Sequence, residues 1–345
     1  MLLFEMNPED QVLFASTRQD FQDAYKEKVL HLSHKYALSW KLIFSKAERH
    51  GVVSLVYLNL CQNPDLELDI PRTIVDFYRL YTVRNTVRKE QRAQSLQAVL
   101  EYFDERSIDV LLIKGGVLDI LIYDHPTFST ISDIDLVLRP SREKFTQPQL
   151  TQIMQDLHGS GIEYDFHAHH DMTINGMLPI DFERIWQDAK RTVYRDLPVW
   201  IMDNEDMLIS LCINSCRKRY FRLKSLLDIA ETIRKIKDLS WDLLAEKSRA
   251  YDCNNIVYAA LAVTNQTLGC ELPPGVLEKL RVKPLRAAVI ERIIHYMIQY
   301  GSLPEEPISG RYIFGRRIHS SLLLPYATYR FYQVRHKLIK EIFKR

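Results

Sequence analysis

Apolar residues recur at steps of three and four from about residue 20 to residue 106, which is the period of an amphipathic helix. The segments 40–47 and 80–87 show this pattern clearly. Asn63-Pro64 and Pro71 interrupt it. We therefore expect two groups of helices, and the second contains a long charged helix over roughly 75–106.

The period changes at Ile108. Residues 109–113 form a short apolar run that ends at Lys114-Gly115-Gly116, which predicts a buried strand entering a tight turn. The apolar positions within 117–122 then predict a short helix. Apolar and polar residues alternate over 133–138, as they do in a half-buried strand.

Three more strands are expected after a helix over 141–158. Asn175-Gly176 is typical of a two-residue hairpin turn, so it predicts strands on either side, around 163–174 and 177–185. Residues 197–202 predict the last strand.

Beyond Asp203 the helical period returns and continues to the end of the chain. The sequence therefore predicts an α+β fold with helices on both sides of a small sheet. We expect an N-terminal helical region over 1–106, a core over 107–203 and a C-terminal helical region over 204–345. A length of 345 residues agrees with two or three structural units.

Composition and charge limit the class of protein and its location in the cell. A net charge of +2 excludes a molecule built as a whole to bind polyanions. Five irregularly spaced cysteines suggest no disulfide framework. The chain has no signal-peptide pattern and no apolar stretch of the roughly 18 residues that a membrane span needs, so we expect a cytoplasmic protein.

The strongest candidate chemistry is a pair of carboxylates. Asp133 and Asp135 are two positions apart on an expected strand, so their side chains leave the same face and repel each other unless a cation compensates. Mg²⁺ (or Mn²⁺) takes such oxygen ligands together with the phosphates of a substrate. Asp181, expected on a later strand, would complete a two-metal site for phosphoryl transfer, and Glu183 lies on the same face of that strand.

The turn at Lys114-Gly115-Gly116 offers a place for phosphates. Backbone N–H groups of Gly115 and Gly116 can approach a triphosphate closely, because neither residue carries a side chain. Lys114 would add positive charge to the same phosphates.

Two other features leave alternatives open. His167 and His169 share a strand face and could bind zinc. Because no cysteine accompanies them, we favour a structural role or an acceptor contact for His169. A general base would come from His169 or Glu183.

Residues 311–345 hold nine Lys/Arg against one acid, interleaved with aromatic residues. That stretch would bind nucleic acid or an anionic membrane surface, or dock on the body through its aromatic side.

The order of strand, Gly-Gly turn, helix, Asp-x-Asp strand and later Asp resembles the DNA polymerase β-type nucleotidyltransferase superfamily. The longer pattern, from about residue 20 to 240, resembles one bacterial branch, the "nucleotidyltransferase family protein" group. The residues that carry this resemblance are Leu111-Leu112-Ile113-Lys114-Gly115, Tyr123, Ser132-Asp133-Ile134-Asp135-Leu136-Val137, His169, Ile180-Asp181-Phe182-Glu183 and Leu226-Leu227-Asp228-Ile229-Ala230.

The resemblance implies a small mixed-sheet nucleotidyltransferase core and a metal-dependent reaction, in which an NMP moves from an NTP such as ATP to an unidentified acceptor: protein, small molecule or RNA. It implies that Asp133, Asp135 and Asp181 are catalytic metal ligands and that Gly115 and Gly116 face the phosphates.

Three departures from the family pattern favour a second interpretation. Gly116 lies 17 residues before Asp133, which is a long spacing for the wider superfamily. Ser129 and Thr130 stand where the branch usually has an Arg, and Glu183 stands where it usually has a His. The alternative is therefore a catalytically degenerate protein of the same fold with a binding or regulatory role.

Overall fold

A computed structural model describes residues 7–125, 127–128, 135–139, 152–153, 155–156, 172–174, 177–218, 220 and 222–301, the last nine of these by their backbone alone. The chain divides into two compact units, each considered by itself below. The first comprises residues 1–169 and 182–207, and the second comprises residues 170–181 and 208–345.

The first unit begins with helices. They are α1 (Pro8–Ala15), α2 (Asp23–Lys35), α3 (Trp40–His50), α4 (Val53–Cys61) and the long α5 (Arg72–Asp104). Local chemistry sets several of their ends: Ser39 Oγ accepts the N–H of Leu42 at the start of α3, and Gly51 ends that helix with a φ of 73°. The predicted break after residue 61 and the long charged helix that follows it are confirmed, although α5 alone takes the place of the expected second group of helices.

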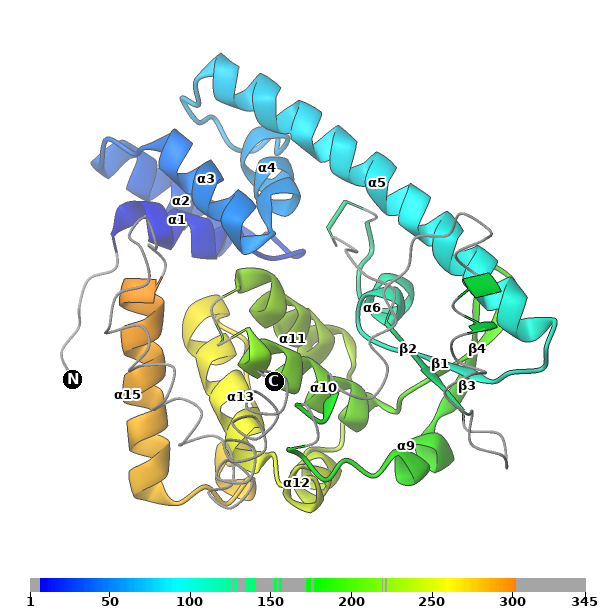
Figure 1. Ribbon diagram of the computed structural model, residues 1–345. Coiled ribbons are helices and arrows are strands. Elements are labelled where there is room, and N and C mark those ends of the chain that lie inside the picture. The colour runs from blue at the N-terminus through cyan, green and yellow to red at the C-terminus, as the bar shows by residue number, and fades with distance from the viewer. Residues whose placement is uncertain are drawn as a thin grey trace, which may run out of the picture. The chain divides into compact units, whose positions relative to one another are not determined.

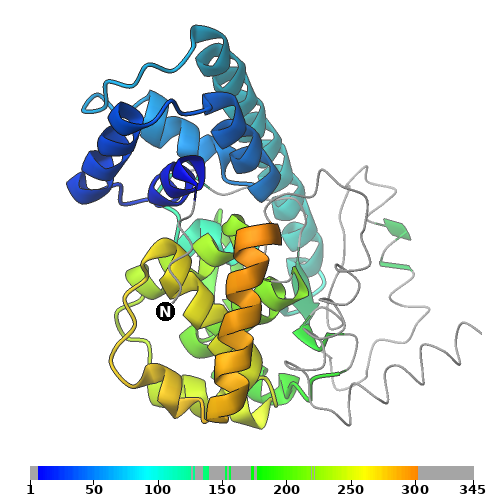
Figure 2. The same cartoon turned by 90° about the vertical axis from the view of Figure 1, so that its left-hand side faces the viewer.

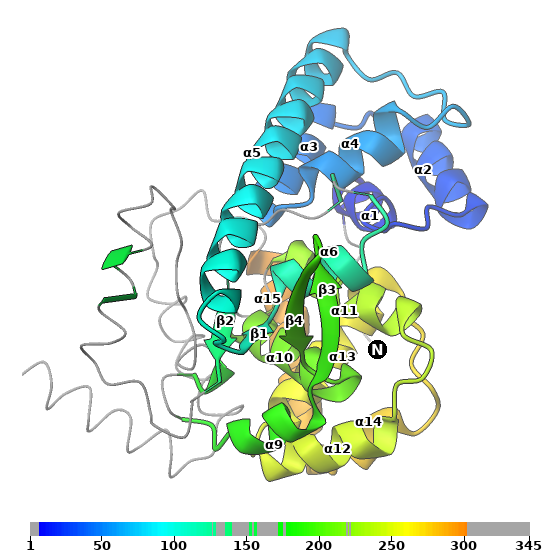
Figure 3. The same ribbon diagram turned by 90° about the vertical axis from the view of Figure 1, so that its right-hand side faces the viewer.

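A four-stranded mixed sheet follows, in the order β2-β1-β4-β3. Strand β1 (Val110–Leu112) is antiparallel to β2 (Leu136–Leu138) and parallel to β4 (Leu197–Ile201), which is antiparallel to β3 (Lys190–Tyr194). Helix α5 contacts both α4 and β4, so it joins the helical group to the sheet (Figures 1 and 3). The expected α+β fold with a small mixed sheet is confirmed.

The strand expected over 177–185 is wrong. Residues Phe182–Asp188 form a helix, α9, which buries Ile185 and Trp186 completely or nearly so. Phe182, Ile185 and Trp186 follow the three- and four-residue steps of a helix, and this pattern outweighs the alternation that suggested a strand. Asn175-Gly176, the expected strand over 163–174 apart from its last three residues, and most of the expected helix over 141–158 lie outside the described residues.

The hairpin that the structure does describe connects β3 and β4. Tyr194 pairs with Leu197, which leaves Arg195 and Asp196 as a two-residue turn. Both have positive φ, 46° and 71°, as a type I′ turn requires. Arg195 donates to Glu90 of α5 at 2.8 Å, so an ion pair holds this turn against the long helix. Strand β3 was not predicted, because its turn lacks glycine and asparagine.

Helix α6 (Gly115–Leu121) follows β1 in the first unit, and α10 (Asn204–Arg217) starts there and continues into the second. The second unit contains α11 (Leu223–Lys235), α12 (Trp241–Ala250), α13 (Asn254–Leu268), α14 (Val276–Lys279) and α15 (Pro284–Gly301). Helix α13 contacts each of the other four, and α15 lies beside it (Figure 2, yellow and orange). The core of the second unit therefore surrounds α13. Among the described residues, no helix combines the length and apolar character needed to cross a bilayer.

Candidate active site

Polar residues next to three of the four strands lie at one edge of the sheet. Because β1 and β4 are parallel and β2 and β3 run the other way, the carboxyl ends of β1 and β4 meet the amino ends of β2 and β3. Lys114 follows β1, Asp203 follows β4 and Asp135 precedes β2 at this edge. Neighbouring strands are roughly 4.8 Å apart, so these residues belong to one narrow region of the first unit.

Lys114 and Asp135 form an ion pair there. The Nζ of Lys114 lies 2.7 Å from Oδ1 of Asp135, and the two side chains are only 11% and 10% exposed. The backbone supports the contact, because the N–H of Ile113 donates to the carbonyl oxygen of Asp135 at 3.2 Å and so extends the β1–β2 pairing to the edge. The structure thus brings together one predicted phosphate-binding residue and one predicted metal ligand.

The turn after β1 has an uncommon backbone. Lys114 has φ 51° and ψ −122°, a combination that L-residues rarely adopt. Gly115 and Gly116 then open α6. A Cβ on Gly116 would stand 2.8 Å from Cδ1 of Leu112, so α6 can lie this close to β1 only because that residue is glycine.

Two contacts from the N-terminal part of the chain hold α6. Lys89 of α5 forms an ion pair with Asp119 of α6, with Nζ and Oδ1 2.9 Å apart and both side chains mostly buried. Just beyond the carboxyl end of α6, the side-chain amide of Gln19 donates to the carbonyl oxygen of Ile122 and accepts the N–H of Asp124, both at 3.0 Å. The carboxyl-terminal half of the helix that follows the Gly-Gly turn is therefore held by two contacts.

Sequence reasoning missed an acidic group at the same edge. Oxygens of Asp188, Asp203 and Asp206 lie within 4.8 Å of one another, and they form a cluster that could hold a metal ion among the residues that the structure describes. Part of this cluster has a structural role, because Asp203 Oδ1 accepts the N–H of Asp206 at 2.8 Å and so caps α10. The helix N-terminus also favours carboxylates in its first turn. The sequence signal was an Asp followed three residues later by another acid directly after a strand.

The remaining predicted site residues have different positions. Asp133 and His169 lie outside the described residues. Asp181 is exposed, precedes α9 rather than lying on a strand, and groups with the second unit. Glu183 lies in the first turn of α9 and is exposed, so the strand face that it was expected to share with Asp181 does not exist.

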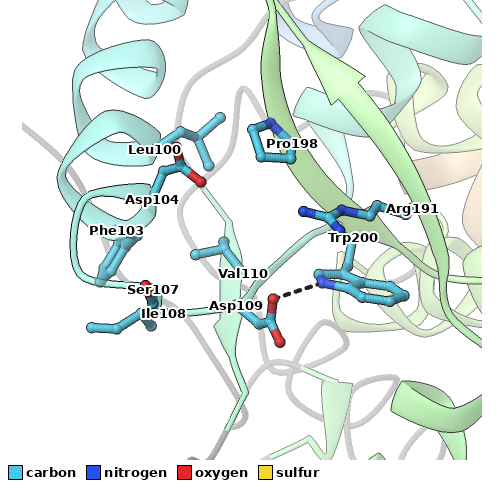
Figure 4. A pocket seen from close by; sticks show the side chains of 10 residues that line it. All are labelled: Leu100, Phe103, Asp104, Ser107, Ile108, Asp109, Val110, Arg191, Pro198 and Trp200. Carbon is cyan, nitrogen blue, oxygen red and sulfur yellow. Dashed lines mark hydrogen bonds between the residues drawn. The ribbon is translucent and has the colours of Figure 1, made fainter.

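A hollow of about 210 Å³ lies at the other end of β1 (Figure 4). Its lining includes Asp109, Arg191 and Trp200, and Trp200 donates its indole N–H to Asp109 at 2.9 Å. Asp109 also pairs with Arg139 at 3.3 Å. These contacts tie the amino end of β1 to β4 and to the residue after β2, so this hollow is separated from Lys114 by the length of the strand.

Comparison with known proteins gives the family of the chain. The family model described as "Uncharacterised nucleotidyltransferase" matches residues 36–269, which include the whole described sheet, the Gly-Gly turn and the second unit up to the end of α13. Neither a curated protein nor a solved structure matches the chain. Since the family model covers well over half of its length, the chain belongs to the uncharacterised nucleotidyltransferase family.

Proposed function

We propose that this protein transfers a nucleoside monophosphate from a nucleoside triphosphate to an acceptor, as a member of the DNA polymerase β-type superfamily and of its bacterial branch. The observation that carries the proposal is the mostly buried Asp135 carboxylate beside Lys114, at the sheet edge where the Gly-Gly turn begins. Family membership supports the reaction class, and the polar groups at this edge support our choice of it as the site.

The residues suit a hard divalent ion. Asp135 offers carboxylate oxygens in a mostly buried position, where a positive charge already compensates them. In our proposal Asp133 would hold Mg²⁺ or Mn²⁺ together with Asp135. The ion would neutralise charge on the phosphates when it is bound.

The protein's own groups would position the substrate. N–H groups of Gly115 and Gly116 and the ammonium group of Lys114 would hold the phosphates, and the fixed helix α6 would keep this turn in place. The acceptor oxygen would attack the α-phosphorus, the bond from that phosphorus to its bridging oxygen would break, and pyrophosphate would leave. His169 or Glu183 would take the acceptor's proton.

We propose that the enzyme is cytoplasmic. If the acceptor is RNA, the basic segment 311–345 would contact it.

Calorimetric titration with ATP or GTP plus Mg²⁺ tests the site. We expect binding that needs the metal and is lost in Asp135→Asn and in the Asp133→Asn/Asp135→Asn double variant. Asp109→Asn is the matched control, because it neutralises an acid at the opposite end of the same strand. If Asp203→Asn abolishes binding while Asp135→Asn keeps it, the acidic group at the start of α10 holds the metal and our assignment is wrong.

Labelling then tests turnover. The protein is incubated with each NTP carrying a labelled α-phosphate, in the presence of cell lysate, and the labelled molecule is identified. Metal-dependent labelling that Asp135→Asn abolishes supports the enzyme. Metal-dependent nucleotide binding without any labelled product would instead favour the degenerate binding or regulatory protein, the interpretation suggested by Ser129 and Thr130.

A further inference from the structure

Two ion pairs of the first unit are closely matched. In Lys114–Asp135 the charged atoms are 2.7 Å apart and the side chains are 11% and 10% exposed. In Lys89–Asp119 the distance is 2.9 Å and the exposures are 11% and 13%. The pairs therefore experience similar desolvation, and they differ in what they connect.

Lys89–Asp119 connects two helices, α5 and α6. Lys114–Asp135 connects the residue that opens the Gly-Gly turn with the residue that precedes β2. Breaking a mostly buried ion pair by removing one partner is costly for the charge that stays. A cation bound at Asp135 and phosphates bound at Lys114 would each offset that cost.

The fold itself positions Lys114 over Asp135. Lys114 is only 11% exposed, and its positive φ turns the chain sharply between β1 and α6. Such a backbone conformation is unfavourable and persists only where the surroundings enforce it. The Ile113–Asp135 backbone bond and the tight packing of Gly116 on Leu112 provide that enforcement.

We propose that Lys114 is an exchangeable counter-ion for Asp135. Its ammonium group neutralises the carboxylate while no divalent ion is present, and it moves to the phosphates when a metal–nucleotide complex takes that carboxylate. This inference rests on the proposed function, which makes Asp135 a metal ligand. Lys114 is then a positioning residue that opposes metal binding alone and favours joint binding of metal and nucleotide.

The test measures Mn²⁺ binding by calorimetry, with MnCl₂ as the only ligand. Lys114→Met removes the competing charge, so the affinity for Mn²⁺ is expected to rise about tenfold, the equivalent of one charge-assisted hydrogen bond. Lys114→Arg should lower the affinity, because a guanidinium group binds a carboxylate through two hydrogen bonds. Lys89→Met is the matched control and should leave Mn²⁺ affinity unchanged. Unchanged or weaker binding in Lys114→Met overturns the proposal.

Each substitution at Lys114 keeps a side chain at a position with positive φ, so it does not change the backbone cost. Far-UV circular dichroism verifies folding. Should Lys114→Met not fold, Lys114→Gln replaces it, because the neutral amide still donates a hydrogen bond to Asp135.

A second measurement adds a non-hydrolysable ATP analogue. In the wild type the analogue should tighten Mn²⁺ binding, and in Lys114→Met this coupling should fall at least severalfold, because the charge that links the two ligands is gone. Equal coupling in both proteins overturns the proposal. The proposed function can fail while the counter-ion exchange holds: the protein would then label no acceptor but would still show these shifts in Mn²⁺ affinity. If Mn²⁺ binds equally well to Asp135→Asn and to the wild type, both the proposed function and the counter-ion exchange are contradicted.

Discussion

Gly116 is the residue at which the packing of the first unit leaves least room. It belongs to the first turn of α6 and faces Leu112 of β1, which is 1% exposed. An added methyl group would meet the end of a side chain that is itself enclosed, so the leucine cannot simply turn away. The glycine therefore matters for packing as well as for the access of phosphates.

Gly116→Ala should lower the free energy of unfolding by about 1 kcal/mol. Overpacking a core lowers stability by about 1–3 kcal/mol. The higher helix propensity of alanine offsets part of this loss, up to about 1 kcal/mol. Urea unfolding followed by circular dichroism measures the change. Gly115→Ala, one residue earlier, is the comparison at the less enclosed position. A urea midpoint for Gly116→Ala equal to or above that of the wild type would show that the Leu112 side chain moves aside without loss of stability.

At the scale of elements, α5 has two unlike faces. One face packs on the N-terminal helices and on β4, with Leu96 2% and Phe103 0% exposed. The opposite face leaves Phe77, Leu80 and Val83 more than half exposed. The helix is long because it packs against two parts of the first unit, the N-terminal helices and the sheet. Its stability depends on the buried face.

Leu96→Ala should therefore destabilise the protein by about 2–5 kcal/mol, because it opens a cavity in a closed core. Leu80→Gln, on the same helix, should change stability by no more than about 0.5 kcal/mol, because Leu80 is 67% exposed. Thermal and urea unfolding of both variants provide the comparison. A loss of more than about 1 kcal/mol in Leu80→Gln would mean that the exposed face has a partner in solution.

The elements also show which parts of the fold local sequence can predict. Helix α5, strand β1 and strand β4 were predicted because each has an unbroken period over its length. Strand β3 and helix α9 were not, because Phe182–Tyr194 holds a short helix and a short strand in direct succession, and a window of that size fits either period. The Arg195-Asp196 turn gives no glycine signal, and its positive φ values are stabilised by the Glu90 contact from a distant helix.

In the candidate site too, local sequence predicts some features and not others. Lys114, Gly115, Gly116 and Asp135 could be predicted because they lie at the ends of two strands that are predictable individually. The pairing of Lys114 with Asp135, and the gathering of Asp203 and Asp206 at that edge, depend on which strands are neighbours. That order joins β1 to β4 across more than eighty residues of chain, and no local pattern encodes it.

At the scale of the whole molecule, both units bury groups that ionise only at high pH. Burial raises the pKa of the Cys61 thiol to about 12 in the first unit, and it raises the pKa of the Cys216 thiol to about 12 in the second. Tyr220, which contacts Cys216, also has a raised pKa because it is buried. In the unfolded chain a thiol loses its proton near pH ~8.5.

The free energy of unfolding should therefore be greatest below about pH 8.5 and should fall as the pH rises from there towards about 12. In that window the unfolded chain has released protons that the folded chain retains, so unfolding is favoured. A fully buried thiol contributes up to about 1.4 kcal/mol per pH unit. Urea unfolding at about pH 7.5, 9 and 10.5 measures the slope. Cys216→Ala should make the slope shallower, since it removes one such group from α10, and a slope identical to that of the wild type would mean that the Cys216 thiol already ionises in the folded protein.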